Sequence, residues 1–197
     1  MQVAVQTRPT PRRRPPAQGR WTYADYARLP NNGMRYEVIR GELYMSPAPS
    51  PIHQRISLIL AVELFTFVEA HKLGRVYTSP IDVNLLSLAN PVQPDVLFIS
   101  RKRLSIIKRK FIEGAPDLIM EVLSPGNPEH DRRTKLQLYA EAGVREYWIV
   151  DPEECAIDIY VLRGQAYALL GRYGAGEQTQ SEVLPEFAVN VDEICQP

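Results

Sequence analysis

The stretch APDLIMEVLSPGNPEHDRRTKLQLYAEAGVREYWIVDP, residues 115–152, decides the fold, because it predicts a strand, a loop, a helix and a second strand. Residues 117–123 and 146–150 are short apolar runs, which is typical of strands that are buried on both faces of a sheet. The predicted helix between them carries Lys135 near its start. One charge, Glu121, lies inside the first run, and a buried carboxylate is costly unless it is paired or binds a metal.

Further strands and one long helix are predicted on either side of this stretch. The long helix is expected over residues 52–72, because Ser50 can cap it and Pro51 suits its first position. Strands are expected at residues 36–39, 42–45, 76–86, 96–100, 156–162 and 166–170, and residues 182–191 are expected to add a last edge strand. This order of elements predicts an α/β protein, in which helices flank a mixed β-sheet.

Length and composition predict one folded domain. The chain has 197 residues, of which 45% are hydrophobic and 23% are charged, as expected of a soluble globular protein. Residues 1–20 are rich in proline and arginine and contain few apolar side chains, so they are expected to form a disordered tail before a domain over residues 21–197. No apolar run approaches the roughly 20 residues of a membrane-spanning helix, so no membrane contact is expected.

Cysteine usage and charge give weaker guidance on compartment and partners. Cys155 and Cys195 are far apart and show no metal-binding spacing, and no secretory signal is recognisable, so we expect a reducing cytoplasm. The chain carries 23 basic and 23 acidic side chains, for a formal net charge of +0. The overall charge therefore argues neither for nor against a nucleic-acid partner, and only local groups of side chains can do so.

Two acids and a lysine carry the predicted chemistry. Asp95 stands at the entrance of the apolar run 96–100, and Glu121 lies inside the run 117–123. If these two strands are neighbours, both carboxylates can converge on one divalent cation such as Mg²⁺, which takes one or two carboxylates and keeps several waters. Lys135 follows in the next helix and can stabilise charge that grows on a phosphate. This combination is typical of a site that cleaves phosphodiester bonds.

Five strings of the sequence resemble a known nuclease family. The strings are YEVIRGELYMSP, SPIHQ, QPDVLFIS, GAPDLIMEVLSP and KLQLYAEAGVREYWIVDP. They are similar to the PD-(D/E)XK nuclease superfamily and, more closely, to its bacterial Uma-two branch of restriction endonucleases, over residues 22–191. The resemblance implies a restriction-endonuclease-like core and Mg²⁺-dependent cleavage of DNA, with Mn²⁺ as a possible substitute. It also implies a homodimer, because cutting both strands of a duplex requires two sites.

The resemblance assigns roles to particular residues. Asp95 and Glu121 match the two acids of the family motif as metal ligands. The superfamily lysine usually stands two residues after the glutamate, where this chain has Leu123, so Lys135 in the following helix is the residue that matches the lysine of this branch. Glu42 resembles an additional acid of the metal site, and His53 is expected to line the cleft with a supporting role.

Each of these residues also has a structural interpretation. Glu121 can be a core carboxylate paired with a basic residue, and Asp117, which also follows a proline, competes with Asp95 for the role of motif aspartate. Lys135 can be a solvated helix residue paired with Asp131 four positions earlier. The basic segment 101–110 can be a solvated loop or a surface that follows a DNA backbone.

Two other classes of function therefore remain open. The same fold can serve as a nucleic-acid-binding module without catalysis, in which case DNA binding without metal-dependent cleavage is expected. It can also serve as an oligomeric interaction protein, in which case no affinity for DNA at low salt is expected.

Overall fold

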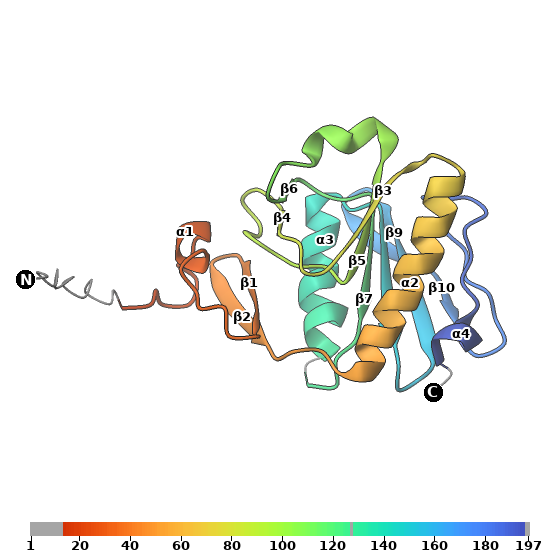
Figure 1. Ribbon diagram of the computed structural model, residues 1–197, viewed down its shortest axis with the longest axis horizontal. Helices are drawn as coiled ribbons and strands as arrows, with labels where there is room; N and C mark the ends of the chain where they lie inside the picture. The colour runs from red at the N-terminus through yellow and green to blue at the C-terminus, as the bar shows by residue number, and fades with distance from the viewer. Residues whose placement is uncertain (1–13, 127, 196–197) are drawn as a thin grey trace, which may run out of the picture.

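A six-stranded mixed sheet forms the centre of the molecule, with strand order β10-β9-β8-β7-β5-β3 (Figure 1). This computed structural model describes residues 14–126 and 128–195. The strands of the sheet are β3 (Gly74–Thr78), β5 (Val96–Ser100), β7 (Leu118–Val122), β8 (Glu146–Asp151), β9 (Ala156–Arg163) and β10 (Ala166–Tyr173). Only β7 and β8 are parallel to each other, and the other neighbouring pairs in this sheet are antiparallel. The predicted α/β class with a mixed sheet is confirmed.

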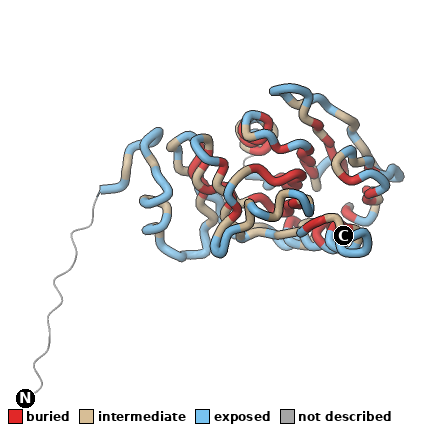
Figure 2. The backbone as a smooth tube through the Cα atoms, turned by 90° about the horizontal axis from the view of Figure 1, so that it is seen from above, coloured by how far each residue is buried: buried red, intermediate tan, exposed pale blue. Residues whose placement is uncertain are grey.

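Helices cover both faces of this sheet. One face packs against α2 (Pro51–Ala70), and the other packs against α3 (Leu136–Ala142). Side chains of β7 alternate between the two layers: Met120 joins the core on the α2 side, and Ile119 joins the core on the α3 side. Figure 2 shows the buried residues gathered in the interior of the body, with exposed residues around them. The β7–α3–β8 unit is the one that the central stretch predicts.

A short hairpin packs beside the sheet at the N-terminal end of the described chain (Figure 1). It consists of β1 (Arg35–Ile39) and β2 (Glu42–Ser46), and it follows the four-residue helix α1 (Tyr23–Tyr26). The backbone N–H of Val38 donates to the carbonyl of Pro91 at 2.8 Å, which attaches the hairpin to the body. Of the predicted tail, residues 1–13 lie outside the described residues, and Gln18 hydrogen-bonds the backbone of Leu43 through both atoms of its amide.

The remaining elements are short. They are β4 (Val83–Asn84), the 3-10 helix η1 (Arg101–Ile106), β6 (Ile112–Glu113), the π-helix η2 (His130–Lys135) and α4 (Val191–Cys195). β4 and β6 pair with each other in a separate two-stranded sheet. The basic segment 101–110 is mostly η1, and its Arg103 is paired with Asp117 at 3.1 Å. This pair and the bond from the N–H of Ser100 give Asp117 a structural environment.

The edge strand expected at residues 182–191 is wrong. This segment has no strand, and it lays Leu184, Phe187 and Val189 on the α2 side of the core as an irregular chain. Its backbone is bound instead by Glu146, a fully buried carboxylate whose Oε2 accepts the N–H groups of Glu182 and Val183. A side chain thus satisfies the donors that a neighbouring strand would satisfy.

Helix α2 is more apolar than expected from the sequence. By length and composition alone, α2 is long and apolar enough to cross a membrane, and it is the one such helix among the described residues. This finding corrects the expectation that no apolar run approaches the length of a membrane span. Ser50 caps the helix by accepting the N–H of His53, and Pro51 occupies its first position. Leu60, Leu64 and Val68 are fully buried against the sheet, as in the core helix of a layered protein.

Candidate active site

Strand pairing brings Asp95 and Glu121 together. β5 and β7 are antiparallel neighbours, with Val96 opposite Met120, so Asp95 at the entrance of β5 stands opposite Glu121. The carboxylate of Asp95 accepts the backbone N–H of Val122 at 3.0 Å, which ties it to the strand position next to Glu121. Both acids are almost completely buried. The expected convergence of these two strands therefore occurs.

Two basic side chains from other elements hold Asp95. Arg35 on β1 donates to Oδ1 at 2.9 Å, and Nε2 of His53 in the first turn of α2 lies 3.1 Å from Oδ2. Burial alone would raise the pKa of Asp95, but the contacts with His53 and Arg35 hold it well below its usual range. Asp95 is therefore a carboxylate at neutral pH. His53 lies in the site, as expected, and its contact is with the acid.

Lys135 lies among three other carboxylates. Its Nζ is 2.9 Å from Oε1 of Glu121, 3.2 Å from Oδ1 of Asp131 and 3.5 Å from Oε2 of Glu37. The six-residue π-helix η2 leads directly into α3, and this wider turn places both Asp131 and Lys135 on the buried side. The pKa of Lys135 is raised well above its usual range because these acids outweigh its burial. Lys135 is thus a buried cation and not a solvated helix residue.

Glu121 is the acid whose charge is least stabilised. The ammonium of Lys135 and the hydroxyl of Tyr139, at 2.8 Å, both donate to its Oε1. No hydrogen-bond donor among residues 14–126 and 128–195 reaches Oε2. Burial, with the nearby Asp95 and Asp131, raises the pKa of Glu121 to about 8 despite the opposing effect of Lys135. Glu121 therefore retains a proton at neutral pH when no further cation is present.

Glu37 on β1 is an acid of the site that was not predicted from the sequence. Its Oε1 accepts the N–H of Gln93 at 2.8 Å, and its Oε2 lies near Lys135 and, at 3.5 Å, His130. Burial opposes ionisation, but Lys135 and His130 lower the pKa of Glu37 to about 2. The signal was present in the sequence, because Glu37 stands between Tyr36 and Val38 in a predicted strand, as Glu121 stands between apolar neighbours in its own.

Glu42, the additional acid expected from the same hairpin, is not in this group. It is exposed, and its carboxylate accepts the hydroxyl of Tyr44 at 2.8 Å. In the β1–β2 register Glu42 pairs with Ile39 beside the turn, whereas Glu37 pairs with Tyr44, two residues farther from the turn. The hairpin therefore contributes an acid to the cluster, but from its other strand.

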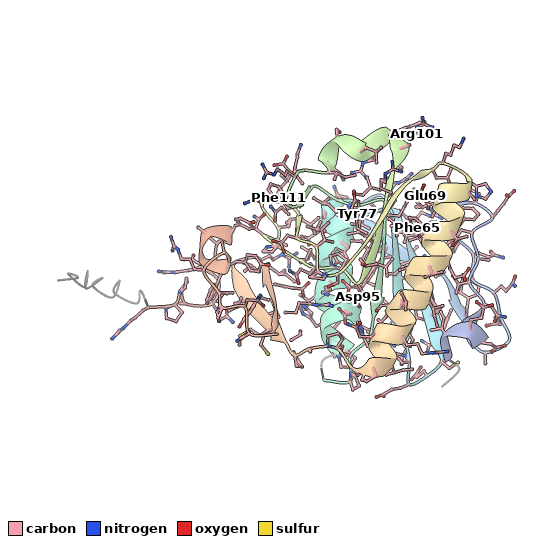
Figure 3. All side chains as sticks on the ribbon, viewed as in Figure 1. Phe65, Glu69, Tyr77, Asp95, Arg101 and Phe111 are labelled. Carbon is pink, nitrogen blue, oxygen red and sulfur yellow. The ribbon has the colours of Figure 1, made fainter. Side chains whose placement is uncertain are left out.

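The acid cluster lines a cavity that adjoins a larger groove. The cavity has a volume of about 60 Å³ and is lined by Glu37, Asp95, Glu121, Asp131 and Lys135, among others. The groove has a volume of about 630 Å³ and lies between the hairpin region and the first half of α2. Arg35, His53 and Asp95 line both spaces. Figure 3 shows Asp95 between the hairpin and α2, where the two spaces meet.

The charges of the cluster suit a divalent cation. When all four are ionised, the carboxylates Glu37, Asp95, Glu121 and Asp131 carry two more charges than the cations Arg35 and Lys135 that face them, and a divalent ion that displaces the proton of Glu121 balances this difference. Among the described residues, no three acid, histidine or cysteine side chains already surround one point. Mg²⁺ needs only one or two carboxylates besides waters, so Asp95 and Oε2 of Glu121 fit as its protein ligands.

Comparison with known proteins gives concordant results. The model of the Uma2 family, described as "Putative restriction endonuclease", matches residues 23–192. The "Uncharacterized protein slr1290" of Synechocystis is 27% identical over 162 residues, which cover 80% of this chain and 82% of that protein. A crystal structure described as "a putative nuclease belonging to DUF820" from Anabaena variabilis superposes with a TM-score of 0.72 at 17% identity, covering 88% of this chain and 96% of that one.

Proposed function

Because the chain belongs to the Uma2 family of restriction-endonuclease-like proteins, we propose that it is a metal-dependent nuclease that hydrolyses phosphodiester bonds in DNA. The observation that carries the proposal is the buried group of Asp95, Glu121 and Lys135 at the edge of a groove. Acids with strongly shifted pKa values beside a cation in a cavity are typical of catalytic sites. A nuclease family implies a nucleic-acid substrate, and DNA is the proposed one.

The residues of the chain have separable roles in this proposal. Asp95 and Glu121 hold Mg²⁺ or Mn²⁺, and Arg35 and His53 keep Asp95 ionised and oriented. The cation, when bound, supplies positive charge that activates a water molecule and polarises a phosphate oxygen. Lys135 keeps its proton among the carboxylates and stabilises negative charge that develops on the phosphate. Arg35 lines both the cavity and the groove, so its remaining donors are available to a phosphate that enters from the groove.

Cleavage of DNA by the purified protein tests the proposal. Supercoiled plasmid, single-stranded DNA and RNA are incubated with Mg²⁺ or Mn²⁺, with an excess of chelator as the control. We expect nicked or linear plasmid only when the metal is present. Cleavage that persists in chelator contradicts the metal-dependent mechanism. Salt-dependent DNA binding without cleavage under any metal favours the binding-module alternative.

Metal binding is expected to depend on pH. The pKa of Glu121 is raised to about 8, so below that pH the metal must displace a proton from its carboxyl group. The affinity for Mn²⁺ should therefore rise by up to about tenfold per pH unit as the pH approaches 8, and level off above it. Calorimetry at pH 7 in buffers of different ionisation enthalpy should detect the release of about one proton per ion. Equal affinity at pH 6 and pH 9 contradicts this assignment.

The two acids of the hairpin give a matched pair of variants. Glu37→Gln removes a carboxylate that contacts Lys135 inside the cluster, so cleavage should fall by on the order of 10²-fold. Glu42→Gln changes an exposed carboxylate on the other strand of the same hairpin, so the rate should change less than about twofold. Initial rates at matched protein concentration decide between them. A large loss with Glu42→Gln and none with Glu37→Gln restores Glu42 as the additional acid.

A further inference from the structure

The outer face of α2 carries a row of apolar side chains. Leu58, Val62 and Phe65 are spaced four and three residues apart, so they lie on one stripe of the helix. Their exposed fractions are 64%, 50% and 54%, respectively. The inner face of α2 already provides the contacts with the sheet, so the packing of the chain gives no reason for this second apolar stripe. A contiguous exposed stripe of this kind marks an interaction surface.

The strand beside α2 has an unpaired edge. β3 is the last strand of the six-stranded sheet, and its only strand partner in the described structure is β5. The backbone N–H of Arg101 donates to the carbonyl of Leu73, and that of Ser79 donates to the carbonyl of Asp95. The backbone groups of the odd-numbered residues of this region therefore face β5. By alternation, the N–H groups of Val76 and Thr78 face away from the sheet. Such an edge is available to pair with another strand.

The helix stripe and the strand edge form one surface. A groove of about 530 Å³ lies between them and is lined by Val62 and Phe65 of α2 and by Val76 and Tyr77 of β3, among others. Figure 3 shows Phe65 and Glu69 along α2 and Tyr77 beside them. The polar end of this surface is formed by Glu69 and Arg75, whose side chains meet at 3.3 Å. We call this α2–β3 surface the edge face.

We infer that the edge face is the contact surface with a second copy of this chain. Antiparallel pairing of two β3 strands about a two-fold axis near Val76 would satisfy the outward N–H and C=O groups of both copies. Because α2 packs beside β3, the same operation brings the two apolar stripes together. The surface is therefore self-complementary in its backbone and apolar groups.

A lipid surface fits the same face less well. Lipid offers no backbone groups to a strand edge, which remains unpaired against a membrane. Helices that lie in a membrane surface carry many basic residues on the polar face, whereas the charged residues of α2 are Arg55, Glu63 and Glu69. A second copy supplies what both the strand and the helix lack.

The position of the edge face has a consequence for the groove beside Asp95. Ala61, Thr78 and Pro80 line both that groove and the apolar one. Pairing through the edge face thus places the two grooves of a dimer near each other, on either side of the axis. The inference rests on the edge face alone, so it stands or falls independently of the nuclease proposal.

Sedimentation equilibrium of the full chain tests the inference. The wild type should be a dimer at micromolar concentration, and Val62→Glu and Phe65→Glu should each weaken association by on the order of 100-fold, because a charge is buried in an apolar contact. Leu169→Glu is the matched control, since Leu169 on β10 has the same 54% exposure as Phe65 but lies at the opposite edge of the sheet. It should leave the dimer intact.

Hydrogen exchange adds a readout that is specific to the strand edge. The amides of Val76 and Thr78 should be protected in the wild-type dimer and should exchange rapidly in Phe65→Glu. Thermal unfolding confirms that each variant is folded. A monomeric wild type, or a dimer that persists in both glutamate variants, overturns the inference. A monomer that floats with anionic vesicles assigns the face to a membrane instead.

Discussion

Replacing Glu121 with glutamine is expected to lower the rate of Mg²⁺-dependent DNA cleavage by on the order of 10³-fold or more. The substitution keeps the volume of the side chain but removes the carboxylate that is proposed to hold the metal with Asp95. The hydroxyl of Tyr139 can still donate to the remaining oxygen, so the local packing should survive. The measurement is the initial rate of plasmid cleavage over a titration of Mg²⁺ and of Mn²⁺.

Asp117→Asn is the matched control for Glu121→Gln. Asp117 is also a buried acid at β7, but its partners are Arg103, Arg145 and the N–H of Ser100, all outside the cavity. Its loss should lower the melting temperature more than the specific activity of the folded protein. If Glu121→Gln cleaves as fast as the wild type, the site is wrong or the activity belongs to a contaminant. Asp95→Asn should behave like Glu121→Gln.

Lys135→Met is expected to destabilise the metal-free protein by about 3–5 kcal/mol. Among the described residues, Lys135 is the one side-chain cation that contacts Glu37, Glu121 and Asp131 together, so the variant leaves three buried acids without that partner. For a domain of this size, such a loss corresponds to a decrease in Tm of roughly 10 °C. Calorimetry in the presence of chelator measures it.

A divalent cation should recover part of the stability that Lys135→Met loses. The variant has an additional uncompensated negative charge, so Mn²⁺ should raise its Tm more than it raises that of the wild type. Lys108→Met is the control, because Lys108 is half-exposed and pairs with the exposed Glu113. That change should alter stability by less than about 0.5 kcal/mol. An unchanged Tm for Lys135→Met, with chelator present, contradicts a cluster that depends on this cation.

Much of the fold could be predicted because its signals are local. Two apolar runs on either side of a polar helix start predict the β7–α3–β8 unit, and Ser50 with Pro51 predicts the beginning of α2. The proximity of Asp95 and Glu121 followed from a single assumption, that their strands are neighbours, and β5 and β7 are neighbours. Lys135 could be placed because it lies within one element of the strand that carries Glu121.

What could not be predicted depends on contacts between distant parts of the chain. Glu37 and Glu42 stand in the same hairpin, and only the docking of that hairpin decides that Glu37 is buried and Glu42 is exposed. The contact between the hydroxyl of Tyr139 and Glu121 depends on the π-helix that precedes α3. Residues 182–191 contain β-branched and aromatic side chains that favour a strand, but their backbone is bound by the carboxylate of Glu146, which is 36 residues away from Glu182.

The contacts of the Glu146 carboxylate also determine when folding can finish during synthesis of the chain. Glu146 binds the backbone of Glu182 and Val183, and the ring centroid of the nearby Phe187 lies 5.8 Å from that of Trp148. This segment leaves the ribosome after the strands and the long helix that it covers. Until then, one layer of the nascent protein keeps its aromatic surface in water. The closing step of folding therefore belongs to the last-made part of the described chain, and the indole fluorescence of Trp148 is a natural reporter of that step.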